Sequence, residues 1–576
     1  MMRLMRWLIG LWIFVVTIVA FVAAYESSKP PTIHNNSVLM VSLAGPYGET
    51  DQIDIESLFT QEPQLSFPEI LHLIYRCADD PRFSGLQLKV ENQALGMAQL
   101  EEFSQAIDAV RSKGKWVHAY LETAGEFAPG TLLYLIASTA DEIVMPPSGE
   151  VNLVGLQAET IFLPDFLKML DIETRVLKRK AYKNAGDFLT HRKFTGPHKK
   201  ALQSLLDDIQ GEIIAHITKF RQFESAQEVH KIIAGGPYTA QEAFDKKLLD
   251  RLEYWDQVYD RLSKDYTDKQ RVSIGTYSMV PPETQPAKTF AYIVAEGQIV
   301  RGESDKNPLS SSSVLGSNSL SRAFRSARED KVDGVLLRVN SPGGSYLASD
   351  LVFREINATK EAGIPIVASM GNVAASGGYF LAMGADRVFA APSTITGSIG
   401  VISMFFSLEK LLKGKLKMHV DRVETMPNAG FFQGSTLPNG KRLKKFEKKM
   451  DQIYLDFTQK AAKARKMPYE ELEKVAQGRV WSGRRAKAVG LVDELGGIRA
   501  ASKALRELAN IAPEEGVRLI DYPPPETPLE ALKQIFLGQT RASLFVRKLA
   551  NAISPYWELG HQNPISASLP PLAPIQ

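Results

Sequence analysis

The sequence has few of the residues that several classes of site require. It contains one cysteine, Cys77, in 576 residues, so an intramolecular disulfide is impossible and a cysteine-based zinc site is not expected. Cys77 ends the largely apolar stretch 71–77, where we expect a buried structural thiol. The net charge of +3 is close to neutral for this length and gives no support for nucleic-acid binding.

Histidine is also scarce, with nine residues in the chain, and none of them lies near the two motifs of the second half described below. The remaining composition is typical of a globular protein, with 44% hydrophobic and 23% charged residues. At roughly 150 residues per domain, the length is sufficient for two or more domains.

The N-terminal segment has the features of a membrane anchor. Arg3 and Arg6 precede an apolar run over residues 7–25, which as a helix would be about 28 Å long, close to the thickness of the hydrocarbon core. Positive charges before the run favour a cytoplasmic N-terminus and an exported body. Residues 22–24, Val-Ala-Ala, also resemble the cleavage site of a signal peptide. We favour a retained anchor over residues 1–28, and both alternatives export the body of the chain.

The chain contains an internal duplication. Residues 140–144, Ala-Asp-Glu-Ile-Val, match residues 385–389, Ala-Asp-Arg-Val-Phe, at an offset of 245. Tyr134 and Tyr379 share this offset. Further matches at offsets of 245 and 243 join Gly155 with Gly400 and Asp250 with Asp493. Several matches in one slowly drifting register indicate a true repeat.

Each copy alternates apolar strand patterns with helical patterns, which predicts an α/β fold. We expect strands at residues 37–43, 85–90 and 116–121 in the first copy and at 290–295, 334–339 and 365–370 in the second, and a helix with a solvated basic face at 441–464. The predicted domains are residues 36–264 and 289–520, with a proline-containing linker at 265–288 and a proline-rich tail at 521–576.

Two motifs in the second copy fit acyl transfer, which needs a nucleophile, a base and donors for the oxyanion. In the stretch 340–345, Asn-Ser-Pro-Gly-Gly-Ser, Gly343 and Gly344 allow backbone N–H groups to approach a carbonyl. In the stretch 374–379, Ala-Ala-Ser-Gly-Gly-Tyr, we expect an exposed Ser376 at a helix start, where the dipole favours negative charge and the Gly377 N–H is close. The alternatives are an ordinary glycine turn and a capping serine.

The repeat points to a base in the other copy. At the offset of 245, Ser376 is matched by Thr131. The stretch that matches the glycine pair, residues 91–94, contains no glycine. Lys183, in Tyr-Lys-Asn-Ala, is matched by Pro427. One copy therefore has the serine without the lysine and the other the lysine without the serine, which predicts an active site shared between them. The alternative is that Lys183 is one of several surface lysines in a basic stretch.

A lysine base must be neutral. A shift of its pKa from about 10.4 by about three units requires about 4 kcal/mol from the environment, and burial would supply it. Ser398, in Thr-Gly-Ser-Ile-Gly at 396–400, would orient the amine, and its match in the first copy is Leu153. The alternative is that Ser398 is a turn hydroxyl.

The motifs at 182–185, 340–345, 374–379 and 396–400 together resemble those of the signal peptide peptidase A family, also called protease IV, in its long, duplicated form. The resemblance covers the chain from the N-terminal run to about residue 520. It implies that each copy has a fold similar to Clp protease and the crotonases. It implies as site residues the nucleophile Ser376, the general base Lys183, the lysine-orienting Ser398, and an oxyanion hole made by the N–H of Gly377 with that of Gly343 or Gly344.

The resemblance also implies a location and partners. Long-form members are bacterial, are anchored in the cytoplasmic membrane with the catalytic body in the periplasm, form bowl-shaped tetramers and degrade released signal peptides. It thus implies a serine endopeptidase of hydrophobic peptides that contacts the lipid bilayer through residues 7–25, forms a homotetramer and needs neither metal nor organic cofactor.

Two other functions fit parts of the sequence. A crotonase-like enzyme of acyl-CoA thioesters would use the same fold and glycine-loop donors, but an exported protein has no supply of CoA. A non-catalytic membrane scaffold of stacked α/β units would leave the Ser376 motif without a chemical role.

Overall fold

The computed structural model describes residues 31–50, 65–91, 95–281, 288–304, 314–426, 428–432, 436–512 and 515–523, and the backbone of a strand at 566–568. The predicted anchor at residues 7–25 and most of the predicted tail lie outside this part of the chain. In the part that is described, no helix combines the length and apolar character needed to cross a membrane.

The first copy is built on a parallel sheet whose strands lie in the order β8-β4-β3-β2-β1-β9. Helices α3 (Phe67–Asp79), α4 (Met97–Ser112) and α5 (Thr131–Ala137) connect successive strands. The strands are β1 (Ser37–Leu43), β2 (Phe83–Val90), β3 (Trp116–Leu121), β4 (Glu142–Met145), β8 (Arg251–Leu252) and β9 (Arg271–Ser273).

The second copy repeats these six strands in the order β20-β16-β15-β13-β10-β21, and two more strands, β17 (Ile395–Gly397) and β19 (Val480–Ser482), join the same sheet through β15. Its connecting helices are α13 (Ser317–Glu329), α14 (Tyr346–Glu361) and α15 (Gly377–Ala382). The strands are β10 (Lys288–Glu296), β13 (Gly334–Ser341), β15 (Ile366–Ala375), β16 (Arg387–Ala390), β20 (Glu494–Leu495) and β21 (Val517–Tyr522). The predicted strands are therefore confirmed, with small differences at their ends.

Matched contacts confirm the duplication. The hydroxyl of Tyr134 donates a hydrogen bond to the carbonyl of Leu248 at 3.1 Å, and that of Tyr379 donates to Leu491 at 3.0 Å. Each tyrosine is fully buried, so its hydroxyl needs such a partner. The two copies also share a helix of 25 residues, which is α8 (Gly196–Phe220) in the first and α16 (Gly440–Ala464) in the second.

The predicted linker at 265–288 is wrong over much of its length. β9 pairs in parallel with β1, and the helix α12 (Ile274–Ser278) follows it, with Tyr277 fully buried. β9 occupies the same edge position in the first sheet as β21 does in the second. The first domain therefore continues to at least residue 278. The prolines dominated the sequence pattern, and a strand of three residues has too short a pattern to outweigh them.

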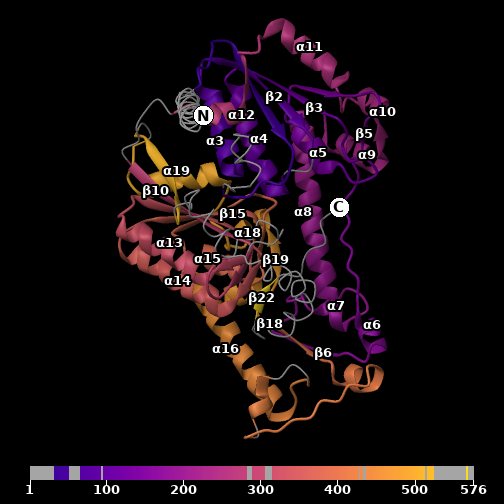
Figure 1. Cartoon of the computed structure of the whole chain (residues 1–576), viewed down its shortest axis with the longest axis vertical. Helices are drawn as coiled ribbons and strands as arrows, with labels where there is room; N and C mark the ends of the chain where they lie inside the picture. The colour runs from indigo at the N-terminus through magenta and orange to yellow at the C-terminus, as the bar shows by residue number, and fades with distance from the viewer. Residues whose placement is uncertain are drawn as a thin grey trace, which may run out of the picture.

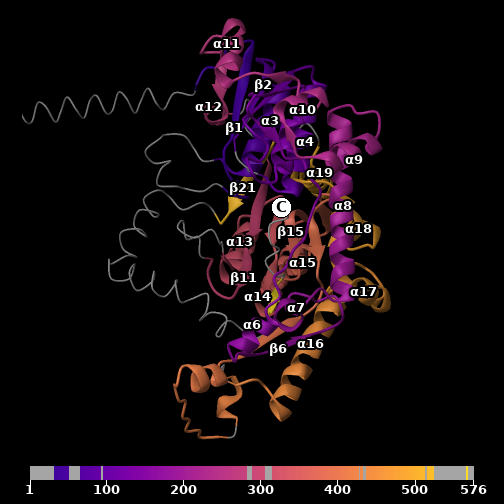
Figure 2. The ribbon, with the colours of Figure 1, turned by 90° about the vertical axis from the view of Figure 1, so that its right-hand side faces the viewer.

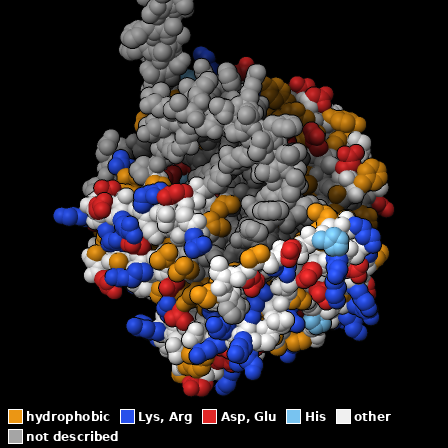
Figure 3. Space-filling view, turned by 60° about the horizontal axis from the view of Figure 1, so that its bottom comes forward, with side chains coloured by type: hydrophobic (Ala, Val, Ile, Leu, Met, Phe, Trp, Pro, Cys, Tyr) orange, Lys and Arg blue, Asp and Glu red, His pale blue; other side chains and the backbone are white. Residues whose placement is uncertain are grey.

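The lower end of the molecule is basic and solvated. Phe446 and Met450 on α16 are buried, whereas the lysines between and beside them, among them Lys445 and Lys449, are exposed. Lys and Arg side chains are numerous on this end (Figure 3). The prediction of a solvated basic helix face is confirmed.

Cys77 is buried and free, as expected, and burial raises the pKa of its thiol to about 12.

A segment of the first copy extends along the second (Figures 1 and 2). The strand β6 (Glu173–Lys178) pairs antiparallel with β18 (Ile402–Ser407) of the second copy. α8, which follows, runs back along both copies toward the first sheet. The loop between β6 and α8 contains Lys183. The pairing of β6 with β18 therefore places the predicted base at the second copy.

Candidate active site

Lys183 and Ser376 meet at the place where the two copies join. The Nζ atom of Lys183 lies 2.9 Å from the Oγ atom of Ser376. It also contacts Ser398, at 2.9 Å from Oγ and 3.0 Å from the backbone carbonyl. All three side chains are buried. The structure thus brings together the predicted nucleophile, base and orienting hydroxyl within hydrogen-bonding distance, and Lys183 is not a surface lysine.

Burial sets the protonation of the lysine. Removal from water lowers the pKa of Lys183 to about 7, because the charged form loses its hydration. Within the described residues, the hydrogen bonds of Nζ go to uncharged oxygens, which offer an ammonium group little compensation. A substantial fraction of Lys183 is therefore neutral at neutral pH, as a general base requires.

Ser376 sits at a strained turn between β15 and α15. Its backbone angles are φ 56° and ψ −113°, a combination that a residue with a side chain rarely adopts. Its N–H donates to the carbonyl of Gly397 at 2.8 Å, which fixes the turn. Ser376 is enclosed rather than exposed, contrary to the expectation, because the Lys183 loop and the Ser398 loop cover it.

The loop that carries Lys183 is anchored by a buried carboxylate. Asp187, fully buried, forms an ion pair with Lys178 at the end of β6 and accepts hydrogen bonds from Asn184 at 2.7 Å and Thr195 at 3.1 Å. These contacts join the two ends of the loop to each other. Lys183 therefore projects from a rigid support.

Glycines provide the space around Lys183. A Cβ atom on Gly478 would lie 2.6 Å from the Cβ of Lys183, and one on Gly400 would lie 3.3 Å from its Cδ. Gly478 has a φ of 75°, which favours glycine in its own right. The neighbouring carbonyl of Arg479 accepts the N–H of Ser398 at 2.7 Å. Sequence analysis missed Gly478 and Arg479, because a lone glycine after a helix has many possible roles.

The glycine loop, residues 340–345, lies beside the nucleophile. Gly343 has a φ of 102° and its N–H donates to Ser341 Oγ at 3.1 Å. The backbone nitrogen of Gly344 lies close to Gly377, where an added Cβ atom would be 3.1 Å from that nitrogen and 2.6 Å from Ser349 Oγ. Of the two glycines considered for the oxyanion hole, Gly344 therefore has its backbone nitrogen close to Gly377, while Gly343 makes the turn and its N–H is hydrogen-bonded to Ser341.

An extended segment lies along this loop. The strand β22 (Ser566–Ser568) pairs antiparallel with β14 (Gly343–Ser345), and Ser566 also pairs with Ile402 of β18. β22 therefore lies between the glycine loop and the strand that supports the Lys183 loop. This edge of the site has backbone groups that pair with an extended polypeptide.

In the described part of the chain, no cluster of histidine, cysteine and carboxylate side chains has the arrangement of a metal site.

A protein-family model described as "Peptidase family S49" matches residues 109–268 and 358–512, one region in each copy. The chain belongs to peptidase family S49. As a member of this family it is a serine peptidase, and neither the acyl-thioester enzyme nor the non-catalytic scaffold is supported.

Curated relatives match most of the chain. It is 31% identical to "Serine protease SPPA, chloroplastic" of Arabidopsis thaliana, over 86% of this chain and 73% of the relative. It is also 31% identical to "Protease 4" of Salmonella typhi, over 90% of this chain and 81% of the relative. "Protease 4" of Haemophilus influenzae is 28% identical, over 78% and 74%. A solved ClpP1 variant of Listeria monocytogenes matches 36% of this chain and 93% of its own, with a TM-score of 0.24 and 16% identity.

Proposed function

We propose that the protein is a membrane-anchored serine endopeptidase that uses a Lys183–Ser376 dyad to degrade signal peptides and other apolar peptides. The observation that carries the proposal is the 2.9 Å separation of Lys183 Nζ and Ser376 Oγ, with a lysine whose pKa is lowered to about 7. A nucleophile and a neutral base in contact are the minimum that acyl transfer requires.

In the acylation step, Lys183 accepts the proton of Ser376 as the serine oxygen attacks the peptide carbonyl. Ser398 holds the amine through its side chain and its carbonyl, so that the lone pair of Nζ is directed at Ser376. The amides of Gly377 and Gly344 bind the oxyanion as negative charge develops on it. Lys183, now protonated, donates its proton to the leaving amine.

In the deacylation step, neutral Lys183 accepts a proton from water, which attacks the acyl-enzyme carbonyl. The same two amides bind the second oxyanion, and the protonated lysine returns its proton to Ser376. Every proton transfer uses one amine, and this requires a pKa close to the working pH.

Peptide substrates are favoured by the shape of the site. The pairing of β22 with β14 and β18 supports a binding mode in which an extended substrate adds a strand antiparallel to the glycine loop. This mode uses backbone groups and tolerates many sequences. A relative from Enterococcus faecium, 34% identical over 54% of its own length, is named "Putative signal peptide peptidase SppA", which supports signal peptides as the substrate class.

We extend the proposal to location and assembly. Residues 7–25 form a single anchor in the bacterial inner membrane, the body lies in the periplasm, and the copies have the Clp protease/crotonase-like fold and assemble as homotetramers. The apolar N-terminal run with its preceding arginines supports the anchor. Protease accessibility in spheroplasts tests the topology, and mass measurement of the detergent-solubilised protein tests the assembly.

The dyad is tested by hydrolysis of a leucine-rich reporter peptide with the full chain. Ser376→Ala and Lys183→Met are each expected to lower kcat about a thousandfold or more. Lys193→Met is a matched control, because Lys193 lies in the same basic stretch but is exposed. Near-normal turnover of Lys183→Met would show that the base is another residue. A polar peptide of equal length tests the preference for apolar sequences.

A further inference from the structure

The strand that leads to Ser376 is irregular just before the nucleophile. β13 and β15 pair regularly as far as Val339 and Met370, and their next pair is Ser341 with Ala374. Three residues of β15, 371–373, thus lie opposite the single residue Asn340, which makes a β-bulge larger than the usual two residues opposite one. Bulges of this kind often redirect a side chain beside an active site.

The corresponding strands of the first copy stop pairing before this point. β2 and β3 pair in one unbroken register from Gly85–Trp116 to Val90–Leu121. The position matched to Ser376 in this copy is Thr131, which has no catalytic partner in the proposed mechanism. The bulge therefore lies in the part of β15 that extends past the equivalent of β3, on the approach to the nucleophile.

Within the second copy, the bulge is attached to the glycine loop. Asn340, which begins that loop, accepts a hydrogen bond from the N–H of Val373 at 3.2 Å. The carbonyl of Gly371 accepts the hydroxyl of Thr394 at 2.8 Å. These two hydrogen bonds hold the bulge against other residues of the second copy.

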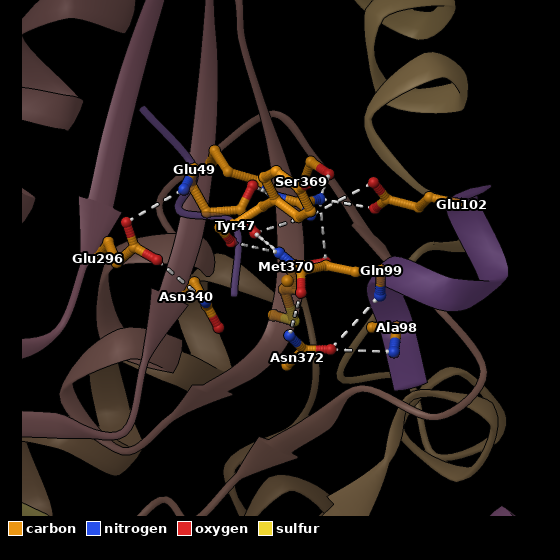
Figure 4. A network of polar contacts seen from close by, with 12 residues as sticks. Tyr47, Glu49, Ala98, Gln99, Glu102, Glu296, Asn340, Ser369, Met370 and Asn372 are labelled. Carbon is orange, nitrogen blue, oxygen red and sulfur yellow. Dashed lines mark hydrogen bonds and ion pairs between the residues drawn. The ribbon is translucent and has the colours of Figure 1, made fainter. Parts of the chain in front are cut away.

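On its outer side, the bulge is attached to a helix of the first copy (Figure 4). The Oδ1 atom of Asn372 accepts the backbone N–H groups of Ala98, at 3.0 Å, and Gln99, at 3.4 Å, in the first turn of α4. Its Nδ2 atom donates to Gln99 Oε1 at 3.0 Å. The residue at the start of α4 is Gly96, which has no side chain to cap the helix, so Asn372 supplies the cap from the other copy.

The same helix holds the strand of the glycine loop through a buried charge cluster. Gln99 Nε2 lies 3.3 Å from Glu49 Oε1, and Glu49 accepts a hydrogen bond from Arg338 Nε at 3.0 Å. Arg338, on β13, also donates to Glu102 of α4 at 2.7 Å. The three charged side chains are buried. Buried ions tolerate little displacement, because any loss of a partner leaves a charge without water or a counter-ion.

We propose that Asn372 and Gln99 are positioning residues for Ser376, so that the first copy holds the nucleophile in place as well as supplying its base. Asn372 lies on β15, four residues before Ser376, and the bulge is short and is attached to both copies. Loss of the hydrogen bonds between Asn372 and α4 lets β15 relax toward a regular pairing and moves Ser376 away from Lys183. This inference rests on the proposed dyad.

The test compares Asn372→Ala, Gln99→Ala and the double variant in the full chain, measuring kcat, KM, the pH midpoint of kcat/KM and the free energy of unfolding. We expect each single variant to lower kcat by about tenfold or more, with KM little changed, because loss of alignment affects the chemical step. We also expect the midpoint to rise from about 7, since a displaced serine admits water to Lys183. The double variant is expected to lose less than the sum of the two single losses, because the two side chains share one hydrogen bond.

Glu212→Gln is the matched control. It removes another ion pair between the copies, with Arg484 at 2.6 Å, and no contact of Glu212 reaches β15 or the glycine loop in the described structure. The proposal is overturned if the variants lose stability alone, with kcat per folded molecule and a pH midpoint equal to those of this control. Additive losses in the double variant would also overturn it. If Asn372→Ala does not fold, Gln99→Ala decides.

The proposed dyad can fail separately from this inference. Ser376→Ala in the same assay is expected to be inactive. If it retains activity, the dyad is wrong. If it is inactive while Asn372→Ala and Gln99→Ala retain the parent kcat, the dyad stands and only the positioning role is wrong.

Discussion

Lys183 and Ser376 are 193 residues apart in the chain, and their side chains touch at 2.9 Å. Each comes from a different copy of one duplicated fold. Because neither copy contains both residues, the proposed mechanism requires both copies. The duplication permits this division, since one copy can lose the serine and the other can lose the lysine while both sheets remain intact.

The pH dependence of the reaction follows from the lysine. The pKa of Lys183 is lowered to about 7, and only the neutral amine accepts the serine proton. Activity is therefore lost as the pH falls through about 7 and reaches a plateau above it. The measurement is kcat/KM against pH for an uncharged reporter peptide. A midpoint near 10, or a flat profile between pH 5 and 9, would assign the base to another group. Lys193→Met should give the parent profile.

Stability should oppose activity at Lys183. The folded pKa is about 7 and the ordinary value is 10.5, so between these values the folded state binds fewer protons than the unfolded state. Burial of the amine therefore destabilises the fold by about 5 kcal/mol well below pH 7, by about 4 kcal/mol at pH 7 and by only about 2 kcal/mol at pH 9.

Lys183→Met removes this penalty and keeps a side chain of similar volume. We expect it to raise the free energy of unfolding by up to about 4 kcal/mol at pH 7, less the contribution of the lost hydrogen bonds, and the gain to shrink as the pH rises. Urea unfolding at pH 7 and 9 measures both values. A gain that does not depend on pH would mean that the lysine is charged in the folded protein.

The meeting of Lys183 and Ser376 was predictable from the sequence because the copies differ at these two positions. Comparison of Ser376 with Thr131, and of Lys183 with Pro427, isolates the dyad without any geometry. The outer part of β15 was not predictable. The apolar strand pattern ends at Met370, and the residues that follow it, held by hydrogen bonds from both copies, have no periodic pattern of their own.

The cap on α4 could not be found from the sequence either. A capping residue is normally sought immediately before its helix, where this chain has Gly96. Asn372 lies more than 270 residues away and reaches the helix only because the two copies pack together. Local rules do not detect a contact whose partners are brought together by tertiary structure.

Gly478 is expected to be needed for the position of Lys183. A Cβ atom at 478 would lie 2.6 Å from the Cβ of Lys183 and 2.7 Å from the backbone nitrogen of Lys183, so Gly478→Ala must displace the base. We expect kcat to fall about a hundredfold, since a shift of about 1 Å is enough for such a loss. Gly490→Ala is a matched control. Its φ of 80° imposes the same backbone strain, but its added Cβ atom would make only ordinary contact with Met467.

Both glycine variants are expected to lose about 1 kcal/mol of stability from strain, and only Gly478→Ala is expected to lose activity. Kinetics and urea unfolding on both variants separate the two effects. Equal activity of the two variants would mean that Lys183 adjusts to the added methyl group.

The strand β22 should compete with peptide substrate. It pairs antiparallel with β14 beside Gly344, along the edge where the proposed substrate adds its own strand. Ala567→Pro removes a backbone N–H and fixes φ, which weakens strand pairing. We therefore expect Ala567→Pro to lower KM for the reporter peptide severalfold and to leave kcat unchanged, because the dyad is untouched. Ala567→Val, which keeps the N–H and favours a strand, is the control and should retain the parent KM. A KM that is equal in both variants would place the peptide on a different edge of the site.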